Sequence, residues 1–227
     1  MVKKSIPFQL QTTIVLHILT EKLWFPPAED AMSDGLLAMG GDLNTDRLLL
    51  AYKSGIFPWY DNDLPLWWHP DPRFVLFPNE LIVSKSMKQL IKQKAFQFTT
   101  NTAFEAVINN CKTISRKDQD GTWINEDVKK AYCQLHKMGV AHSAEVWSNG
   151  KLVGGLYGIR LGKIFFGESM FSNQSNASKY AFIEYVEILK NEGVVLIDCQ
   201  VYTSHLESLG AIMIARNEFM EILKRNI

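Results

Sequence analysis

The feature that most constrains the fold is an uneven distribution of proline. Seven of the eight prolines and four of the six tryptophans lie between residues 24 and 78. Proline lacks a backbone donor and breaks helix interiors, so this segment favours short strands and turns. One helix is predicted within it, from a cap at Asn44 or Thr45 to a stop at Gly55. We therefore predict a small α+β domain over residues 1–77.

The rest of the chain has a more regular periodicity. Helices are predicted after N-caps at Ser84 and Asn125, and after a capping box formed by Thr102 and Glu105. Asn149-Gly150 separates two apolar runs and predicts a hairpin, because this dipeptide suits a type I′ turn. The remaining elements are predicted as a third strand (163–171), a helix (176–190), a buried strand (194–201), a last strand (211–214) and a C-terminal helix from 217.

This order of elements resembles the acyltransferase fold of the GNAT superfamily. The predicted class is α/β (α+β), with a GNAT-like domain over residues 78–227 whose mixed central sheet is flanked by helices. The Gly-rich turn that holds the pyrophosphate of coenzyme A in ordinary GNAT enzymes has no counterpart after the third strand. Fold order alone does not define an activity.

Charge and cysteine content exclude several classes of protein. The 24 basic and 24 acidic residues give no net charge, so any nucleic acid must be held by a local basic patch. Three cysteines without a CxxC motif fit a reducing compartment. The N-terminal apolar stretch is interrupted by Gln9 and Gln11 and lacks a cleavage site, and no run has the length of a membrane span. We expect a cytoplasmic protein with no membrane partner.

The first candidate site is Asp198-Cys199-Gln200, at the end of the buried strand. Alternate side chains of a strand share one face, so Asp198 and Gln200 are expected to point together at the mouth of the sheet, where ligands often bind. The alternative is a polar strand end bonded to a loop. Cys199 is expected to be a small core residue, because burial raises a thiol pKa.

The second candidate is Glu168, which lies within an aromatic strand. A glutamate there is costly unless it is paired or binds a ligand. The alternative is a structural pair with a nearby basic residue. Neighbouring Ser169 is not in a GxSxG elbow, so a nucleophilic hydrolase is not supported.

Exposed aromatic and basic side chains supply a third set of candidates. Trp59 and Trp123 follow turn-like sequence and could stack a nucleobase, whereas Trp67 and Trp68 are expected in the core. One predicted helix carries a basic stripe that either binds a phosphate backbone or is a solvated face: Lys85, Lys88 and Lys92. Walker loops and metal-ligand spacings are absent from the sequence, so no cofactor or metal is expected.

Taken together, the motifs resemble the leucyl/phenylalanyl-tRNA–protein transferase family. They run in order along nearly the whole chain, and their combination is highly specific. One departure is His69, where the family pattern leads us to expect serine. The matching stretches are GLLAMGGD (35–42), YKSGIFPW (52–59), WWHPDPR (67–73), GTWI (121–124), GESMFS (167–172), NASK (176–179) and DCQ (198–200).

The resemblance implies transfer of Leu or Phe, and more weakly Met, from aminoacyl-tRNA to the N-terminal Arg or Lys of a protein. The product would be marked for N-end-rule proteolysis. Trp59 and Trp123 would flank the terminal adenosine, with Tyr52 nearby, and Glu168 would orient the aminoacyl ester. We expect a monomer.

The same resemblance puts Asp198 and Gln200 at the reacting carbonyl and the incoming amine. We predict that the Gln200 side-chain carbonyl accepts a hydrogen bond from the amine, and that Asp198 either orients that amine or takes its proton. A route assisted by the terminal ribose of the tRNA would leave Asp198 an electrostatic role only.

Specificity for Leu and Phe requires an apolar pocket, or these residues are plain core. Two rival functions are an acyl-CoA-dependent N-acyltransferase and a non-catalytic tRNA-binding module. The predicted pocket residues, from one helix face and the facing strands, are Leu156, Phe165, Met170, Phe182, Tyr185, Leu189 and Ile197.

Overall fold

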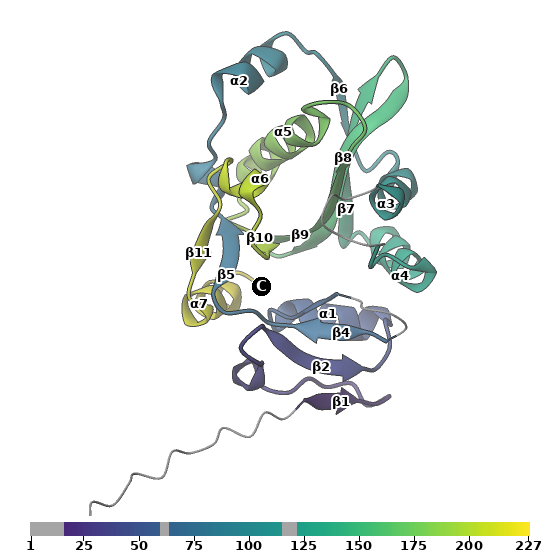
Figure 1. The fold of residues 1–227 in the computed structure, drawn as a ribbon, viewed down its shortest axis with the longest axis vertical. Helices are drawn as coiled ribbons and strands as arrows, with labels where there is room; N and C mark the ends of the chain where they lie inside the picture. Colours follow the sequence, from purple (N-terminus) through teal and green to yellow (C-terminus); the bar gives the residue numbers. More distant parts are fainter. Residues whose placement is uncertain (1–15, 60–63, 115–121) are drawn as a thin grey trace, which may run out of the picture.

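The computed structural model describes residues 16–59, 64–114 and 122–227. The N-terminal stretch considered for a signal peptide, up to residue 15, and Gly121 of the GTWI motif lie outside these ranges. Two sheets organise the described chain, one of four strands at the N-terminal end and one of seven strands (Figure 1).

The smaller sheet has the strand order β1-β2-β4-β3. As expected from the proline content, its strands are short, and one helix accompanies them. Gly55 ends this helix in the left-handed conformation (φ 72°) that glycine adopts readily. The elements are β1 (His17–Leu19), the 3-10 turn η1 (Ala28–Asp30), β2 (Leu36–Gly40), α1 (Thr45–Lys53), β3 (Phe57–Pro58) and β4 (Leu66–Trp68).

The larger sheet has the order β11-β5-β10-β9-β8-β7-β6 and is mixed, because only the β9–β10 pair is parallel. Its strands are β5 (Arg73–Leu76), β6 (Gln97–Thr100), β7 (Ala141–Ser148), β8 (Lys151–Leu161), β9 (Ile164–Ser172), β10 (Leu196–Gln200) and β11 (Ile212–Ile214). The remaining helices are η2 (Pro78–Glu80), α2 (Lys85–Lys92), α3 (Phe104–Thr113), α4 (Glu126–Lys137), α5 (Ala177–Asn191), α6 (Ser204–Glu207) and α7 (Arg216–Asn226). The predicted α/β class, with a mixed central sheet flanked by helices, is confirmed.

Local sequence signals fixed most of these elements. Asn149 and Gly150 both have positive φ, as a type I′ turn requires, and join β7 to β8. The Asn125 side chain caps α4 by accepting from the amide of Val128 at 2.9 Å. The capping box of Thr102 and Glu105 is wrong, because both side chains have distant partners instead. Thr102 donates to Glu145, and Glu105 pairs with Lys129 across to α4.

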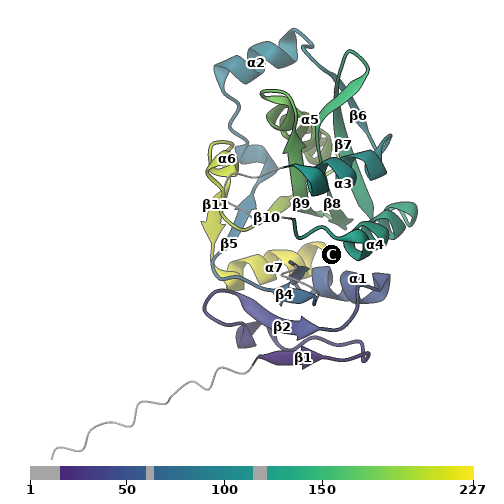
Figure 2. The same ribbon diagram turned by 45° about the vertical axis from the view of Figure 1, so that its right-hand side comes forward.

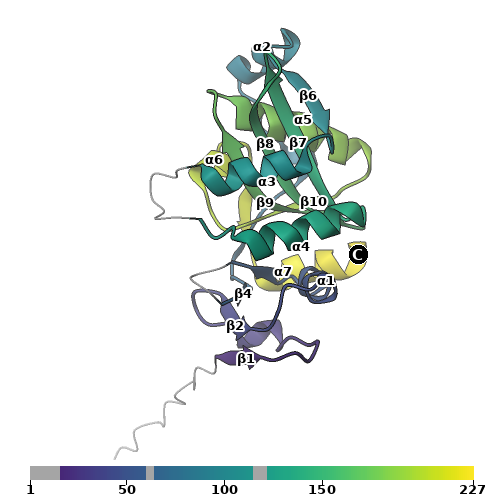
Figure 3. The ribbon, with the colours of Figure 1, turned by 90° about the vertical axis from the view of Figure 1, so that its right-hand side faces the viewer.

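Strand β5 joins the N-terminal region to the larger sheet. Its residues precede the expected boundary at residue 77, yet they pair with β10 and β11 (Figure 1). The change from one sheet to the other therefore falls between Trp68 and Arg73. Helix α7 returns the C-terminus to a position beside α1, between the two sheets (Figures 2 and 3).

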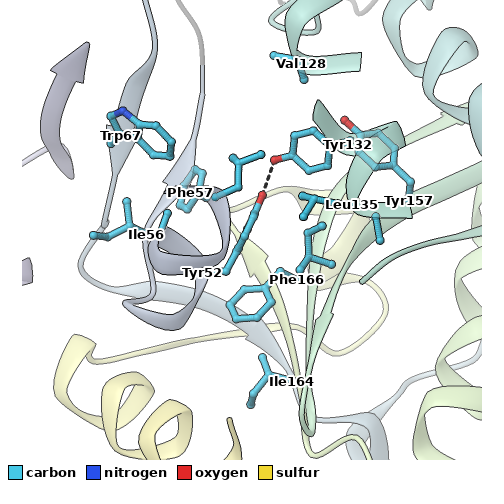
Figure 4. Packing of buried hydrophobic residues seen from close by; sticks show 14 of the residues in the cluster. Tyr52, Ile56, Phe57, Trp67, Val128, Tyr132, Leu135, Tyr157, Ile164 and Phe166 are labelled. Atoms are coloured by element: carbon cyan, nitrogen blue, oxygen red, sulfur yellow. Dashed lines mark hydrogen bonds between the residues drawn. The ribbon is translucent and has the colours of Figure 1, made fainter. Parts of the chain in front are cut away.

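Helices cover both faces of the larger sheet. Helix α5 packs on one face, against β7, β8 and β9, while α3 and α4 pack on the other. The core on the α3–α4 side is continuous with the N-terminal domain, so Tyr52 of α1 lies among Tyr132 of α4 and Phe166 of β9 (Figure 4). The N-terminal domain therefore reaches the strands that carry the candidate site.

Candidate active site

A cavity of about 680 Å³ opens where β9 and β10 separate. The two strands pair in parallel only from Ile164 and Leu196 to Phe166 and Asp198. Beyond that point β9 continues along β8, whereas β10 ends at Gln200. The polar ends of both strands line the gap, together with residues of α5, α6 and strand β3 of the N-terminal domain.

Glu168 lies at the centre of a network of neutral donors. Its Oε1 accepts from the Tyr52 hydroxyl at 2.7 Å and from Gln200 Nε2 at 2.8 Å, and its Oε2 accepts from the Tyr132 hydroxyl at 3.0 Å. The two tyrosine hydroxyls also lie within hydrogen-bond distance of each other (Figure 4), and because each carries one proton, all three contacts are made only when Glu168 is itself protonated. The alternative of a structural pair with a basic residue is therefore wrong.

These surroundings raise the pKa of Glu168 to about 7. Burial is the largest cause, and the hydrogen bonds from Tyr52, Tyr132 and Gln200 oppose it. Burial and the nearby Glu168 carboxylate raise the pKa of both tyrosines well above the usual value, so both hydroxyls stay protonated and donate. Glu168 can therefore gain or lose a proton near neutral pH.

Asp198 has a different partner, and sequence analysis missed it. Arg73 at the start of β5 donates from Nε to Oδ1 at 2.8 Å and from Nη2 to Oδ2 at 2.7 Å, and both side chains are fully buried. The available signal was an arginine at the head of an apolar run (Phe74–Phe77), a position that requires a buried partner.

Gln200 is brought to Glu168 by an irregular strand end. The register of β10 against β5 shifts between Asp198 and Gln200, and Gln200 has a left-handed backbone (φ 63°). Simple alternation along a regular strand, as predicted, is therefore wrong: the Gln200 side chain faces Glu168 at the cavity, whereas the Asp198 side chain is fully buried behind the cavity wall against Arg73. Cys199 between them is buried, and burial raises the pKa of its thiol well above the usual value, as expected for a core cysteine.

The predicted separation of the tryptophans holds only in part, and Tyr52 does not join those at the cavity. Trp59 and Trp123 line the cavity, Trp123 with 9% of its surface exposed, while Trp67 is fully buried and Trp68 is half-buried. Trp59 is steadied by Trp68, whose indole lies 5.8 Å away and donates to the Trp59 carbonyl at 3.1 Å. Tyr52 has no exposed surface. Tyr52 therefore presents no face to the cavity, and it meets the cavity wall through its hydrogen bond to Glu168.

Most of the predicted pocket lines the cavity. Two residues do not: Tyr185 and Leu189 lie in the core behind it, and Tyr185 packs edge-on against Phe165 at 5.2 Å. Helix periodicity identified the inward face of α5 but could not separate wall from core. The residues that form the apolar wall are Leu156, Phe165, Met170, Phe182 and Ile197.

Helices α2, α4 and α6 carry further residues that bear on the site. Lys85, Lys88 and Lys92 are exposed on α2, at the end of the molecule away from the N-terminal sheet, and none lines the cavity (Figures 1 and 3). Tyr132 of α4 was missed as a partner of Glu168. His205 of α6 was also missed: it lines the cavity, and burial lowers its pKa.

His69, the departure from the family pattern, is structural. It is fully buried outside the cavity, and its Nδ1 donates to the carbonyl of Gly55 at 2.7 Å. Burial and the charge of Arg73 lower its pKa to about 4, so it is neutral at pH 7.

Comparison with known proteins gives a consistent result. A family model described as "Leucyl/phenylalanyl-tRNA protein transferase" matches residues 75–224, and one for the N-terminal domain of that protein matches residues 41–71. The chain belongs to this family. The N-terminal match ends at residue 71 and the other begins at 75, within β5, close to where the chain passes from one sheet to the other.

Curated relatives agree over almost the full length. Leucyl/phenylalanyl-tRNA–protein transferases from Flavobacterium johnsoniae and Syntrophus aciditrophicus are 57% and 55% identical to this chain. The matches cover 92% and 89% of this chain and 99% and 85% of the relatives. The Pseudomonas putida relative is 53% identical, over 91% of this chain and 92% of its own length. The predicted family and transferase class are confirmed. No helix in the described ranges is long and apolar enough to cross a membrane.

Proposed function

We propose that this protein transfers Leu or Phe, and more weakly Met, from aminoacyl-tRNA to the N-terminal Arg or Lys of acceptor proteins, which marks them for proteolysis. One observation carries the proposal. A single cavity combines an apolar wall, two tryptophans and a carboxylate–amide pair, Glu168 and Gln200. These features match the three parts of an aminoacylated tRNA end: an amino acid side chain, an adenosine and a reactive ester.

The apolar wall supports a pocket for the aminoacyl side chain. Leu156 and Phe165 come from the strands, and Phe182 comes from α5 on the facing side. Burying a Phe side chain there would contribute about 1.5–3 kcal/mol. Shape alone would disfavour β-branched Ile and Val only modestly, by about 10–200-fold.

The tryptophans support a place for the terminal adenosine. Trp59 belongs to the N-terminal domain and Trp123 precedes α4, so the two domains would hold the nucleobase together. Stacking on such faces contributes about 1–3 kcal/mol per base. The exposed lysines of α2 would add contacts to the tRNA backbone, whose strength falls as salt rises.

The chemistry needs little beyond alignment and proton transfer. The ester is already activated, and the attacking α-amine has an ordinary pKa near 7.7–8.0. Alignment of two bound substrates can lower the barrier by roughly 7–11 kcal/mol. Gln200 donates its amide NH₂ to Glu168, and among the described residues its Oε1 has no donor, so Oε1 can accept from the amine. Glu168, with a pKa near 7, would orient the ester and exchange protons.

The remaining expectations are proposals as well. The three free cysteines suit a reducing cytosol, where we place the protein. We propose that it acts as a monomer, since one chain supplies every wall of the cavity.

The deciding experiment incubates the protein with labelled Phe-tRNA and a peptide that begins with Arg. We expect labelled peptide as the product, and much less with a matched peptide that begins with Ala. Saturable binding of acetyl-CoA would favour an acyl-CoA enzyme instead. Binding of Phe-tRNA without any transfer would favour a tRNA-binding module.

Two variants separate the walls of the cavity in the same assay. Leu156→Trp fills the apolar wall and should reduce Phe transfer more than tRNA binding. Trp59→Ala removes a stacking face and should weaken tRNA binding by about 5–150-fold, the equivalent of 1–3 kcal/mol. Equal losses of transfer and binding in both variants would contradict the assignment of the two walls.

A further inference from the structure

The Arg73 guanidinium is enclosed on all sides by parts of the chain that are distant in sequence. Its carbon lies 4.7 Å from the ring centroid of Phe57 in the N-terminal domain and 4.7 Å from that of Phe219 in α7. Its Nε and Nη2 atoms form a bidentate ion pair with Asp198 of β10. Aromatic rings packed over a guanidinium and a bidentate ion pair at its edge together hold it in one orientation.

The Asp198 carboxylate accepts three hydrogen bonds in this arrangement. Oδ1 accepts from Arg73 Nε and from the backbone amide of Gln200 at 2.9 Å, while Oδ2 accepts from Arg73 Nη2. Asp198 has no exposed surface. A group that takes a proton must come within about 2.6–3.2 Å of it or reach it through one water. The buried and paired carboxylate is poorly placed for that task.

The backbone N–H of Gln200 donates a hydrogen bond to Asp198. This bond determines where the side-chain amide of Gln200 points. Gln200 has a left-handed backbone, which costs about 1–3 kcal/mol for most residues and needs support from its surroundings. Asp198 Oδ1 gives that support, and the Gln200 side chain then reaches Glu168. A continuous chain of contacts therefore runs from Arg73 through Asp198 and Gln200 to Glu168.

We propose that Arg73 is a positioning residue for the transfer reaction: it fixes Asp198, and Asp198 in turn holds Gln200 against Glu168 in the geometry that receives the amine. Asp198 is then a positioning residue too, and not the proton acceptor. This inference rests on the proposed transfer activity and adds the residue that aligns its polar centre.

The first test is Arg73→Lys, which keeps the positive charge but cannot form the bidentate pair with Asp198. A misplacement of about 1 Å can cost about 10²-fold in rate, so we expect a loss of that order in single-turnover transfer. The Kd for Phe-tRNA should stay within twofold, because its adenosine and side-chain contacts lie on other walls. A transfer rate within threefold of wild type, or an equal loss in tRNA affinity, would overturn the proposal.

The second test asks whether Arg73 and Asp198 act through one link. Asp198→Asn should lose transfer to a similar extent, and the double variant with Arg73→Lys should be no slower than the slower single variant. Losses that multiply would show independent roles and would contradict the proposal. A wild-type protein that fails to transfer would instead contradict the proposed function, which keeps the two failures distinct.

A third variant leaves the ion pair intact. Phe219→Leu removes one stacked face from outside the cavity, and we expect a transfer loss of about 3–10-fold, well below that of Arg73→Lys, with unchanged tRNA affinity. Phe104→Leu is the matched control, since Phe104 is also a buried phenylalanine outside the cavity. Equal rates in the two variants would count against a role for the guanidinium's orientation.

Discussion

Two carboxylates flank the separation of β9 and β10, and they are held in opposite ways. Asp198 is fully buried and forms a bidentate ion pair with the guanidinium of Arg73. Glu168 is partly exposed to the cavity and bound by two tyrosine hydroxyls and an amide, all neutral. Gln200 joins the two, because its backbone amide donates to Asp198 and its side chain to Glu168.

The difference shows how one site can combine rigidity with proton exchange. A guanidinium partner holds a carboxylate in a fixed geometry through two charge-assisted hydrogen bonds. Neutral donors hold a carboxyl in place without requiring its charge, so Glu168 can titrate near pH 7. The N-terminal domain serves both groups, through Phe57 against Arg73 and Tyr52 against Glu168. It is therefore part of the site and not merely attached to it.

The largest expected effect comes from removing the charge that holds Asp198. Arg73→Met leaves a buried carboxylate unpaired, and we expect the free energy of unfolding to fall by about 3–5 kcal/mol in urea titrations. Arg225→Met is the matched control, because Arg225 is 76% exposed and its pair with Glu221 lies on the surface. That change should stay within about 0.5 kcal/mol.

A double variant sharpens this first prediction. Arg73→Met combined with Asp198→Leu removes both charges, and it should recover most of the lost stability, since an apolar pair of similar volume often replaces a buried ion pair without cost. It should not recover transfer activity. A double variant as unstable as Arg73→Met alone would mean that the arginine stabilises through its aromatic contacts and not through Asp198.

The second prediction concerns the pH dependence of stability that Glu168 contributes. Its folded pKa of about 7 lies above the usual 4.5, so the folded protein binds more protons than the unfolded chain between these pH values. The free energy of unfolding should therefore fall as pH rises through this window, by up to about 1.4 kcal/mol per pH unit from this group. Glu168→Gln should remove that slope from the wild-type profile.

An exposed glutamate with the opposite shift is the control. Lys112 lowers the pKa of Glu126 by hydrogen bond and charge, so the contribution of Glu126 is lost as pH falls through its folded pKa, and Glu126→Gln should change the profile in the opposite sense and weakly. Identical profiles for wild type and Glu168→Gln would mean that Glu168 ionises as an ordinary surface carboxyl. The contrast between the two carboxylates would then be lost.

Sequence patterns predicted the polar residues of the site much better than they predicted the partners that hold those residues in place. Asp198, Gln200 and Glu168 stand in family motifs, and local signals such as Asn149-Gly150 fixed the strands that carry them. Arg73 was missed because it lies 125 residues before Asp198, and the two meet only through the non-local order β5-β10.

Tyr132 was missed for a related reason. Helix periodicity can place a residue on the inward face of α4, but it cannot show that α4 faces α1 across Glu168. The left-handed turn at Gln200 carries no signal either, because it arises where β10 loses register against β5. Periodicity identifies faces, and only long-range topology determines which faces meet.

The smallest expected effect tests the neutral side of the comparison. Tyr132→Phe removes the donor to Glu168 Oε2 while Tyr52 and Gln200 still serve Oε1. Because a hydrogen bond to the charged form lowers a pKa, its loss should raise that of Glu168 above 7, by about one pH unit. An NMR titration of the Glu168 carboxyl carbon measures the midpoint directly. Tyr180→Phe is the control, since the Tyr180 hydroxyl contacts the Phe96 carbonyl and does not line the cavity. A midpoint that moves equally in both variants, or falls in Tyr132→Phe, would show that burial alone sets the titration of Glu168 and that the tyrosines only fill space.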